Sequence, residues 1–161
     1  MTALAEPRFE KRDSFLIAGL TQRFTPDTMS NIANIWQRFA PNIGKVPGQS
    51  GKVTWGVISN FTNVEAFDYM AAVELSPYTS LPRNLDVIHI PALNYAVFPH
   101  TGHVSGLKQT IDAIWREWQP NFPRAIKSPK PGIPSLLERY SETFSHKTAL
   151  GEVEVWVPVA S

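Results

Sequence analysis

The chain has 161 residues, of which 43% are hydrophobic and 18% are charged, with a net charge of +1 and no cysteine. Such a length allows one domain, 1–161, with a substantial core. The balanced charge gives no electrostatic footprint for nucleic acid or anionic lipid, and the lack of cysteine excludes disulfides, thiolate chemistry and cysteine-based zinc sites. No segment resembles a membrane span, and charges near the N-terminus interrupt a signal-peptide pattern, so we expect a cytoplasmic protein.

The first half of the chain predicts a strand, a helix and two more strands. Residues 8–24 are apolar on both alternating sides, which is typical of a strand covered on both faces. A threonine, a proline and an acid at 25–27 favour a helix start, and the helix is expected to end near residue 40. Residues 42–52 are rich in glycine and proline and predict a loop, followed by strands at 54–61 and 67–75.

The second half predicts the same order of elements. A short extended piece at 86–90 precedes a strand at 92–100 and a helix at 104–118. A proline-rich loop is expected at 119–135, and loops of this length often lie over sites. Two last strands are predicted at 136–144 and 152–159.

One pattern occurs twice, Ile-x-x-Ile-Trp-x-x-aromatic-x-Pro-Asn, at 32–42 and again at 111–121. Its apolar positions form one helical stripe, which unrelated amphipathic helices also share. Shared tryptophan, proline and asparagine in register favour an internal duplication instead. We therefore predict an α+β fold made of pseudo-repeats at about 8–76 and 86–159. In this fold two β-α-β-β units meet around a pseudo-twofold axis, with an antiparallel sheet, helices on one face and a ligand cleft between the halves.

Glu138 is the most informative polar residue. In a strand at 136–144, the period of 2 places it on the same face as Leu136 and Tyr140, so a carboxylate interrupts an apolar surface. Such a group needs a cationic partner, has a raised pKa, or awaits a cationic ligand. A structural ion pair with the next strand, or a partly wet face, explains the pattern equally well.

Several aromatic residues are candidates for ligand walls. Tyr69, Tyr95 and Tyr140 lie on predicted strands, and tyrosines around one carboxylate suit a flat, lipophilic cation. Trp118 at the end of its helix and Trp156 opposite the valines of its strand either pack or line a ligand. The spacing of the histidines does not favour a metal site, and no nucleotide-binding or serine-hydrolase motif is present.

These features carry a resemblance to a known family. The runs that carry it are 67–75, 90–102, 114–120, 137–140 and 153–159. From about residue 8 to 159 the chain resembles the DNA gyrase inhibitor-like, AraC-type effector-binding domains, the ligand-binding domains of multidrug regulators. The resemblance implies a duplicated fold with a cleft for small aromatic or cationic compounds. The family's Glu-x-Tyr motif matches Glu138-Arg139-Tyr140, which gives Glu138 the role of facing the cation, while Ala72 replaces a frequent glycine.

Three hypotheses follow. The first is a drug sensor or sequestering protein that binds a lipophilic, cationic or aromatic compound through Glu138. Its expected walls are Tyr140, Tyr95, Trp118, Trp156, Tyr69 and Phe61. The second is a hydrolase of strained, cyclopropane-containing toxins, as some family members are, with Glu138 as the catalytic group. The third is a regulator acting through protein contacts, with gyrase or a DNA-binding protein as partner. We expect no cofactor, no metal, no direct nucleic-acid contact and no membrane partner.

Overall fold

The computed structural model describes residues 4–160 apart from 61, 63–64, 78–79, 101–102, 127–131 and 146–147. The described residues form one eight-stranded sheet in the order β1-β6-β8-β7-β3-β4-β2-β5, and every neighbouring pair is antiparallel. The strands are β1 (Arg8–Arg12), β2 (Phe15–Phe24), β3 (Gln49–Ser59), β4 (Phe67–Leu75), β5 (Asp86–Ile90), β6 (Leu93–His100), β7 (Leu136–Tyr140) and β8 (Val153–Val159).

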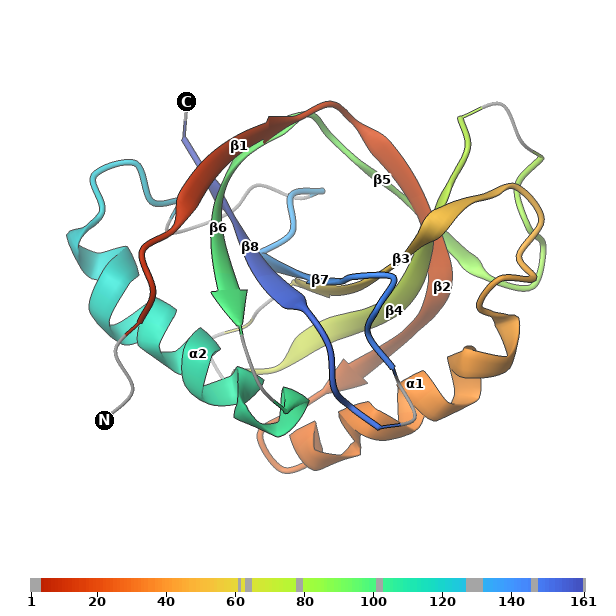
Figure 1. Cartoon of the computed structure of the whole chain (residues 1–161), viewed down its shortest axis with the longest axis horizontal. Coiled ribbons are helices and arrows are strands. Elements are labelled where there is room, and N and C mark those ends of the chain that lie inside the picture. Colours follow the sequence, from red (N-terminus) through yellow and green to blue (C-terminus); the bar gives the residue numbers. More distant parts are fainter. Residues whose placement is uncertain are drawn as a thin grey trace.

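Two helical segments cover one face of this sheet (Figure 1). The first is α1 (Ile32–Phe39), flanked by 3₁₀ turns at Met29–Asn31 and Ala40–Asn42. The second is α2 (Leu107–Ala113), which begins after a 3₁₀ turn at Val104–Gly106 and continues as a π-helix at Ile114–Trp118 and a 3₁₀ turn at Gln119–Asn121. No helix among the described parts of the chain is both long enough and apolar enough to cross a membrane.

The predicted α+β class, with an antiparallel sheet and helices on one face, is confirmed. Strands β2-β4-β3 and β6-β8-β7 stand in mirrored order on the two sides of the β3–β7 pair. The element orders β2-α1-β3-β4 and β6-α2-β7-β8 also match. This symmetry agrees with the predicted repeats, but the duplication itself and the cleft between the halves stay predictions.

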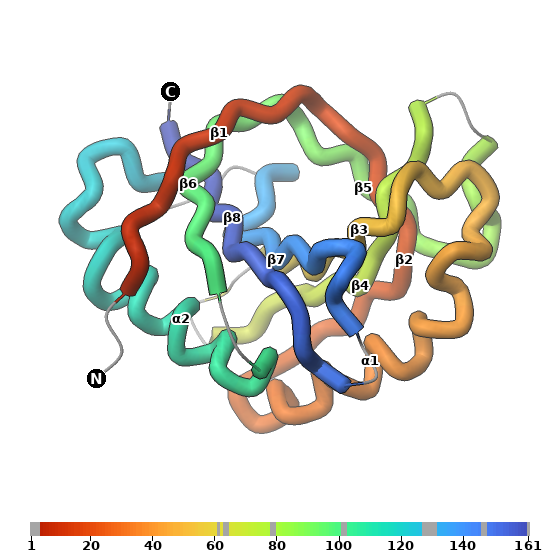
Figure 2. The backbone as a smooth tube through the Cα atoms, viewed as in Figure 1, coloured from red at the N-terminus to blue at the C-terminus, as the bar shows by residue number. Residues whose placement is uncertain are grey.

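The sheet curls into a ring, as the backbone tube in Figure 2 shows. Pairing passes in one continuous register from β1–β6 to β2–β5, because Arg12 faces Leu93 and Phe15 faces Ile90. Arg12 on β1 also forms a 2.7 Å ion pair with Glu74 on β4, although β6, β8, β7 and β3 separate those strands in the sheet. The curl therefore gives the sheet an inner face and an outer, helix-covered face.

Both faces of the sheet are apolar, which explains the strand patterns. On β8 the valines at 153, 155, 157 and 159 belong to the core under the helices, whereas Trp156 belongs to the cluster inside the curl. The sequence predicted this division on β8. It placed some boundaries incorrectly, since β3 begins at Gln49 with a register shift before Thr54, and β7 ends at Tyr140. Part of the proline-rich loop and Phe61 lie outside the described residues.

Candidate functional site

Glu138 is held on β7 near the middle of the sheet. It pairs with Gly56 of β3 on one side and Val155 of β8 on the other. Its neighbours in the period-2 pattern, Leu136 and Tyr140, belong to the core under the helices, so the carboxyl group lies on the helix-covered face. Only 6% of the residue is exposed. The predicted face of this strand is therefore correct, and the partly wet alternative is excluded.

Two tyrosine hydroxyls converge on one oxygen of this carboxylate. Tyr69 on β4 donates to Glu138 Oε1 at 2.5 Å, and Tyr140 donates to the same oxygen at 2.7 Å. Trp36 of α1 donates its indole N–H to the Tyr69 hydroxyl at 2.9 Å. Hydrogen bonds to an ionised acceptor are shorter and stronger than neutral ones. The helix, β4 and β7 thus form one chain of donors that ends at the carboxylate.

Gly56 makes room for this network. A Cβ atom at this position would collide with the Tyr69 hydroxyl and with Glu138 Oε1. Since Gly56 lies directly opposite Glu138 in the β3–β7 pairing, any side chain on β3 here would fill the space that the two polar groups share. The glycine is therefore a packing requirement of the buried hydrogen bonds.

The electrostatics of the site follow from burial. Burial raises the pKa of the Glu138 carboxyl above its ordinary value of 4.5, and the two tyrosine hydrogen bonds offset part of that rise. Burial and then the charge of Glu138 raise the pKa of Tyr69 and Tyr140 well above 10, so both hydroxyls remain donors. No arginine, lysine or histidine in the described part of the chain forms an ion pair with Glu138. The structural ion pair left open by the sequence is therefore absent from the described residues.

Aromatic rings surround the carboxylate. Trp36 lies edge-on to Tyr140 with ring centroids 5.2 Å apart and also contacts the Tyr69 ring at 6.5 Å. The Phe144 ring also packs against Tyr140, with centroids 4.8 Å apart. Ring faces carry partial negative charge that attracts cations. This site combines one carboxylate with several such rings in a buried volume.

The structure separates the other predicted wall residues from Glu138. Tyr95 and Trp156 belong to the cluster inside the curl, on the opposite face of the sheet, so the prediction that they share one wall with Glu138 is corrected. The physical reason is that their strands are apolar on both faces, and both side chains project inward. Trp118 packs on the helix-covered core against Phe98 and Phe122, with ring centroids 4.9 and 4.4 Å apart, and is not among the rings that contact Tyr69 or Tyr140 in the described contacts.

Two surface hollows are described, and Glu138 lines neither. One, of about 390 Å³, lies on the inner side of the sheet and includes Trp156. The other, of about 510 Å³, lies beside the N-terminal segment and includes Trp118. Of the predicted ligand residues, the structure therefore brings together Glu138, Tyr69 and Tyr140.

Comparison with known proteins identifies the family of the chain. A family model described as the GyrI-like small molecule binding domain matches residues 5–160. The chain belongs to this family. The GyrI-like chain is 25% identical over 154 residues to the transcriptional regulator BrlR of Pseudomonas aeruginosa, and the match covers 94% of the chain. It spans about half of that relative, since the match covers 54% of BrlR.

Solved structures share the fold of this GyrI-like domain. SAV2435 bound to tetraphenylphosphonium has a TM-score of 0.76 and 18% identity, with 98% of this chain and 95% of that chain covered. The EcmrR C-terminal domain has a TM-score of 0.64 and 13% identity, with 97% and 98% covered. At these identities the likeness shows the fold.

Sequence reasoning missed two residues of the GyrI-like domain's buried network. Trp36 was assigned to helix packing, which is its usual role at that spacing, yet it also donates to Tyr69. Gly56 carried no signal, because its importance depends on the strand opposite. The repeated tryptophan at 36 and 115 was the available clue for the first.

Proposed function

We propose that this GyrI-like domain binds a lipophilic organic cation against Glu138, under α1. The observation that carries the proposal is a nearly fully buried carboxylate with two tyrosine donors and no ion-pair partner among the described residues. A buried carboxylate is costly unless it is paired, and burial favours its neutral form. A cation without hydrogen-bond donors, surrounded by apolar groups, supplies the missing charge and keeps water away.

The surrounding rings support the choice of ligand. Trp36, Tyr69 and Tyr140 present aromatic surface beside the carboxylate, and cation–π attraction adds about 0.5–2 kcal/mol for each well-placed ring. Tetraphenylphosphonium, which is bound in the SAV2435 structure, has this combination of delocalised charge and aromatic surface. It is therefore the probe of choice for this chain.

Binding at this position requires movement of the side chains that cover Glu138. Trp36 is only 9% exposed, and its indole is fixed by the Tyr69 hydroxyl. A ligand that reaches the carboxylate must displace this indole or the end of α1. We expect the emission of Trp36 to change on binding, which gives the titration an optical signal.

The test is a titration of the purified chain with tetraphenylphosphonium, compared with the Glu138→Gln variant. Removing one partner of a desolvated charge pair costs about 2–5 kcal/mol, so the variant should bind about 30-fold more weakly or worse. Glu152→Gln is the matched control, because Glu152 is exposed. Neutral triphenylphosphine oxide should not show this dependence on Glu138. Equal affinity of the wild type and Glu138→Gln for the cation would refute the proposal.

A further inference from the structure

The inner face of the curled sheet carries a hollow on the side opposite Glu138. It has a volume of about 390 Å³, within the usual range for small-molecule sites. It is lined by Arg8, Glu10, Lys11, Arg12, Arg139, Glu154 and Trp156. Because Arg139 follows Glu138 on β7, their side chains project to opposite faces of the sheet. This hollow is therefore separate from the site proposed above.

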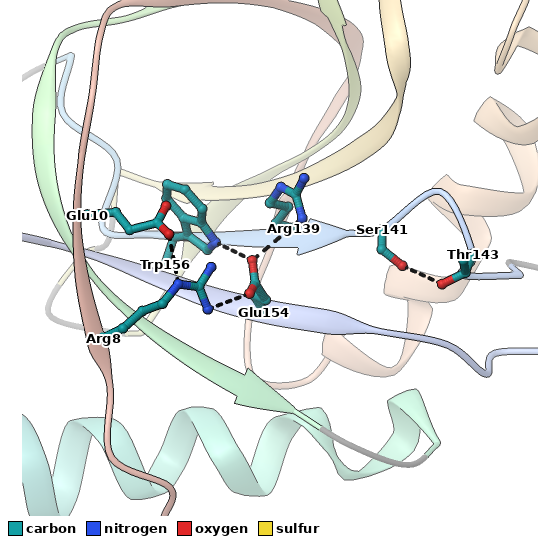
Figure 3. A network of polar contacts seen from close by, with 7 residues as sticks. All are labelled: Arg8, Glu10, Arg139, Ser141, Thr143, Glu154 and Trp156. Atoms are coloured by element: carbon teal, nitrogen blue, oxygen red, sulfur yellow. Dashed lines mark hydrogen bonds and ion pairs between the residues drawn. The ribbon is translucent and has the colours of Figure 1, made fainter.

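Charged side chains line the wall of this hollow. Three arginines and two carboxylates project into it, whereas Lys11 lies between Glu10 and Arg12 on β1 and projects to the opposite face of the sheet. Figure 3 shows Glu154 at the centre of a network, with Arg8 at 2.7 Å, Arg139 at 3.6 Å and the Trp156 indole at 3.1 Å. Burial raises the pKa of Glu154, but the bonds from Arg8 and Trp156 and the charges of both arginines outweigh it and lower that pKa. Glu154 therefore stays ionised and is shared among several donors.

Not every cation in the lining is neutralised there. Among the described residues, the one ion pair of Arg139 is the 3.6 Å contact with Glu154, which Arg8 approaches more closely. Arg12 is paired with Glu74 outside the hollow. Arg139 is therefore the arginine of the lining with the weakest ion pair, and it can bind an anionic ligand.

Two buried hydrogen-bond donors beside Trp156, on the inner face of the sheet, also favour a ligand with acceptor groups. The Trp55 indole N–H and the Tyr95 hydroxyl are buried without a hydrogen-bond partner among the described residues. Both rings pack edge-on against Trp156, with centroids 5.5 and 5.1 Å away. Buried donors without acceptors are rare and costly in native proteins. If Trp156 shifts, a carboxylate bound in the hollow could accept hydrogen bonds from the Trp55 indole and the Tyr95 hydroxyl and remove this energetic penalty.

We propose that this hollow is a second ligand site and that it takes a small aromatic carboxylate. The carboxylate would lie against Arg139, and the ring would lie against Trp156. Aromatic surface continues inward from this wall, since Arg12 stacks over Phe15 at 3.8 Å and Phe15 contacts Trp55 at 5.3 Å. Cationic and aromatic groups together favour an aryl anion over a plain inorganic one.

Benzoate is the probe, titrated into the full chain at neutral pH and followed by the indole N–H resonances of its five tryptophans. We expect saturable shifts of the Trp55 and Trp156 resonances and none of Trp36, which lies across the sheet. Arg139→Gln should weaken binding about tenfold or more, since a hydrogen bond between charged groups is lost. Arg139→Lys keeps the charge and should retain part of the affinity, and it serves as the second variant if Arg139→Gln does not fold.

Arg23→Gln is the matched control, because Arg23 pairs with Asp68 at the surface and does not line the hollow. Benzyl alcohol tests for the carboxylate and sodium sulfate tests for a general ionic effect. Saturation by benzoate, weakened in Arg139→Gln and kept in Arg23→Gln, supports the proposal. Lack of saturation, equal binding of benzyl alcohol, equal shifts with sulfate, or shifts centred on Trp36 would each overturn it. These readouts do not depend on tetraphenylphosphonium, so a failure here leaves the Glu138 site to its own test.

Discussion

Gly56→Ala should destabilise the fold, although a change from glycine to alanine in a strand normally does the opposite. The added Cβ would collide with the Tyr69 hydroxyl and Glu138 Oε1, so at least one of these groups must move. Each hydrogen bond to the carboxylate is worth about 1.5–3 kcal/mol, and the network has two. Loss of both is expected to cost about 3–6 kcal/mol, far above the gain of about 0.4–1 kcal/mol from a less flexible unfolded chain.

The assay is thermal unfolding followed by circular dichroism. The net loss is at least about 2 kcal/mol once that gain is subtracted. In a domain of this size each kcal/mol corresponds to about 2–4 °C, so the melting temperature should fall by at least about 4 °C. Gly106→Ala is the control, because a Cβ there would make only an ordinary 3.4 Å contact with His100. A Gly56→Ala protein as stable as the wild type would refute the claim that this glycine makes room for the buried network.

Three further predictions concern the same framework. Tyr140→Phe removes one hydrogen bond to the ionised Glu138, which raises the pKa of its carboxyl group, so the midpoint of pH-dependent tetraphenylphosphonium binding should rise by about one pH unit or more. The control Tyr95→Phe, on the opposite face of the sheet, should leave this midpoint unchanged. Burial raises the pKa of Glu138 in the folded state above 4.5, so the carboxyl group contributes its full stability below pH 4.5 and loses that contribution as the pH rises through the raised pKa. Urea unfolding measured across this pH range should show a loss of stability that the Glu138→Gln variant lacks. Arg12→Gln breaks the ion pair to Glu74 that joins β1 to β4 and should cost about 1 kcal/mol in urea unfolding, and a cost of zero would mean that this pair does not help to close the ring.

Much of the fold could be predicted from the sequence because most of the strands have two buried faces. Strands β4 and β5 were predicted with the bounds that the structure gives, since Ser76-Pro77 follows β4 and Pro91 follows β5 as clear end signals. The early start of β3 was not readable, because residues 49–52 contain glycine and lysine and join the sheet only through pairing across a register shift. The closing of the sheet was not readable either, since it depends on the shared register of β1–β6 and β2–β5.

The site was only partly predictable for a related reason. Alternation on β7 correctly placed Glu138 and Tyr140 together, because both belong to one strand. Strands β6 and β8 are apolar on both faces, and the sequence does not show which of these faces lies on the same side of the sheet as Glu138. The strand order and the curl of the sheet determine this. Tyr95 and Trp156 were therefore grouped with the wrong face, while Trp36 was overlooked. The hydrolase alternative rests on the same carboxylate and stays a prediction, to be tested by turnover of a cyclopropane-containing substrate that is lost in Glu138→Gln.

The most direct test of the central claim is a crystal structure of the chain with tetraphenylphosphonium. The ligand is expected beneath α1 on the helix-covered face, with phenyl rings against Tyr69 and Tyr140 and the Trp36 indole displaced. Its phosphorus should lie within about 6 Å of an aromatic ring centroid and face the Glu138 carboxylate. A ligand bound only in the hollow beside Trp118, with the hydrogen bonds of Glu138 undisturbed, would contradict the account.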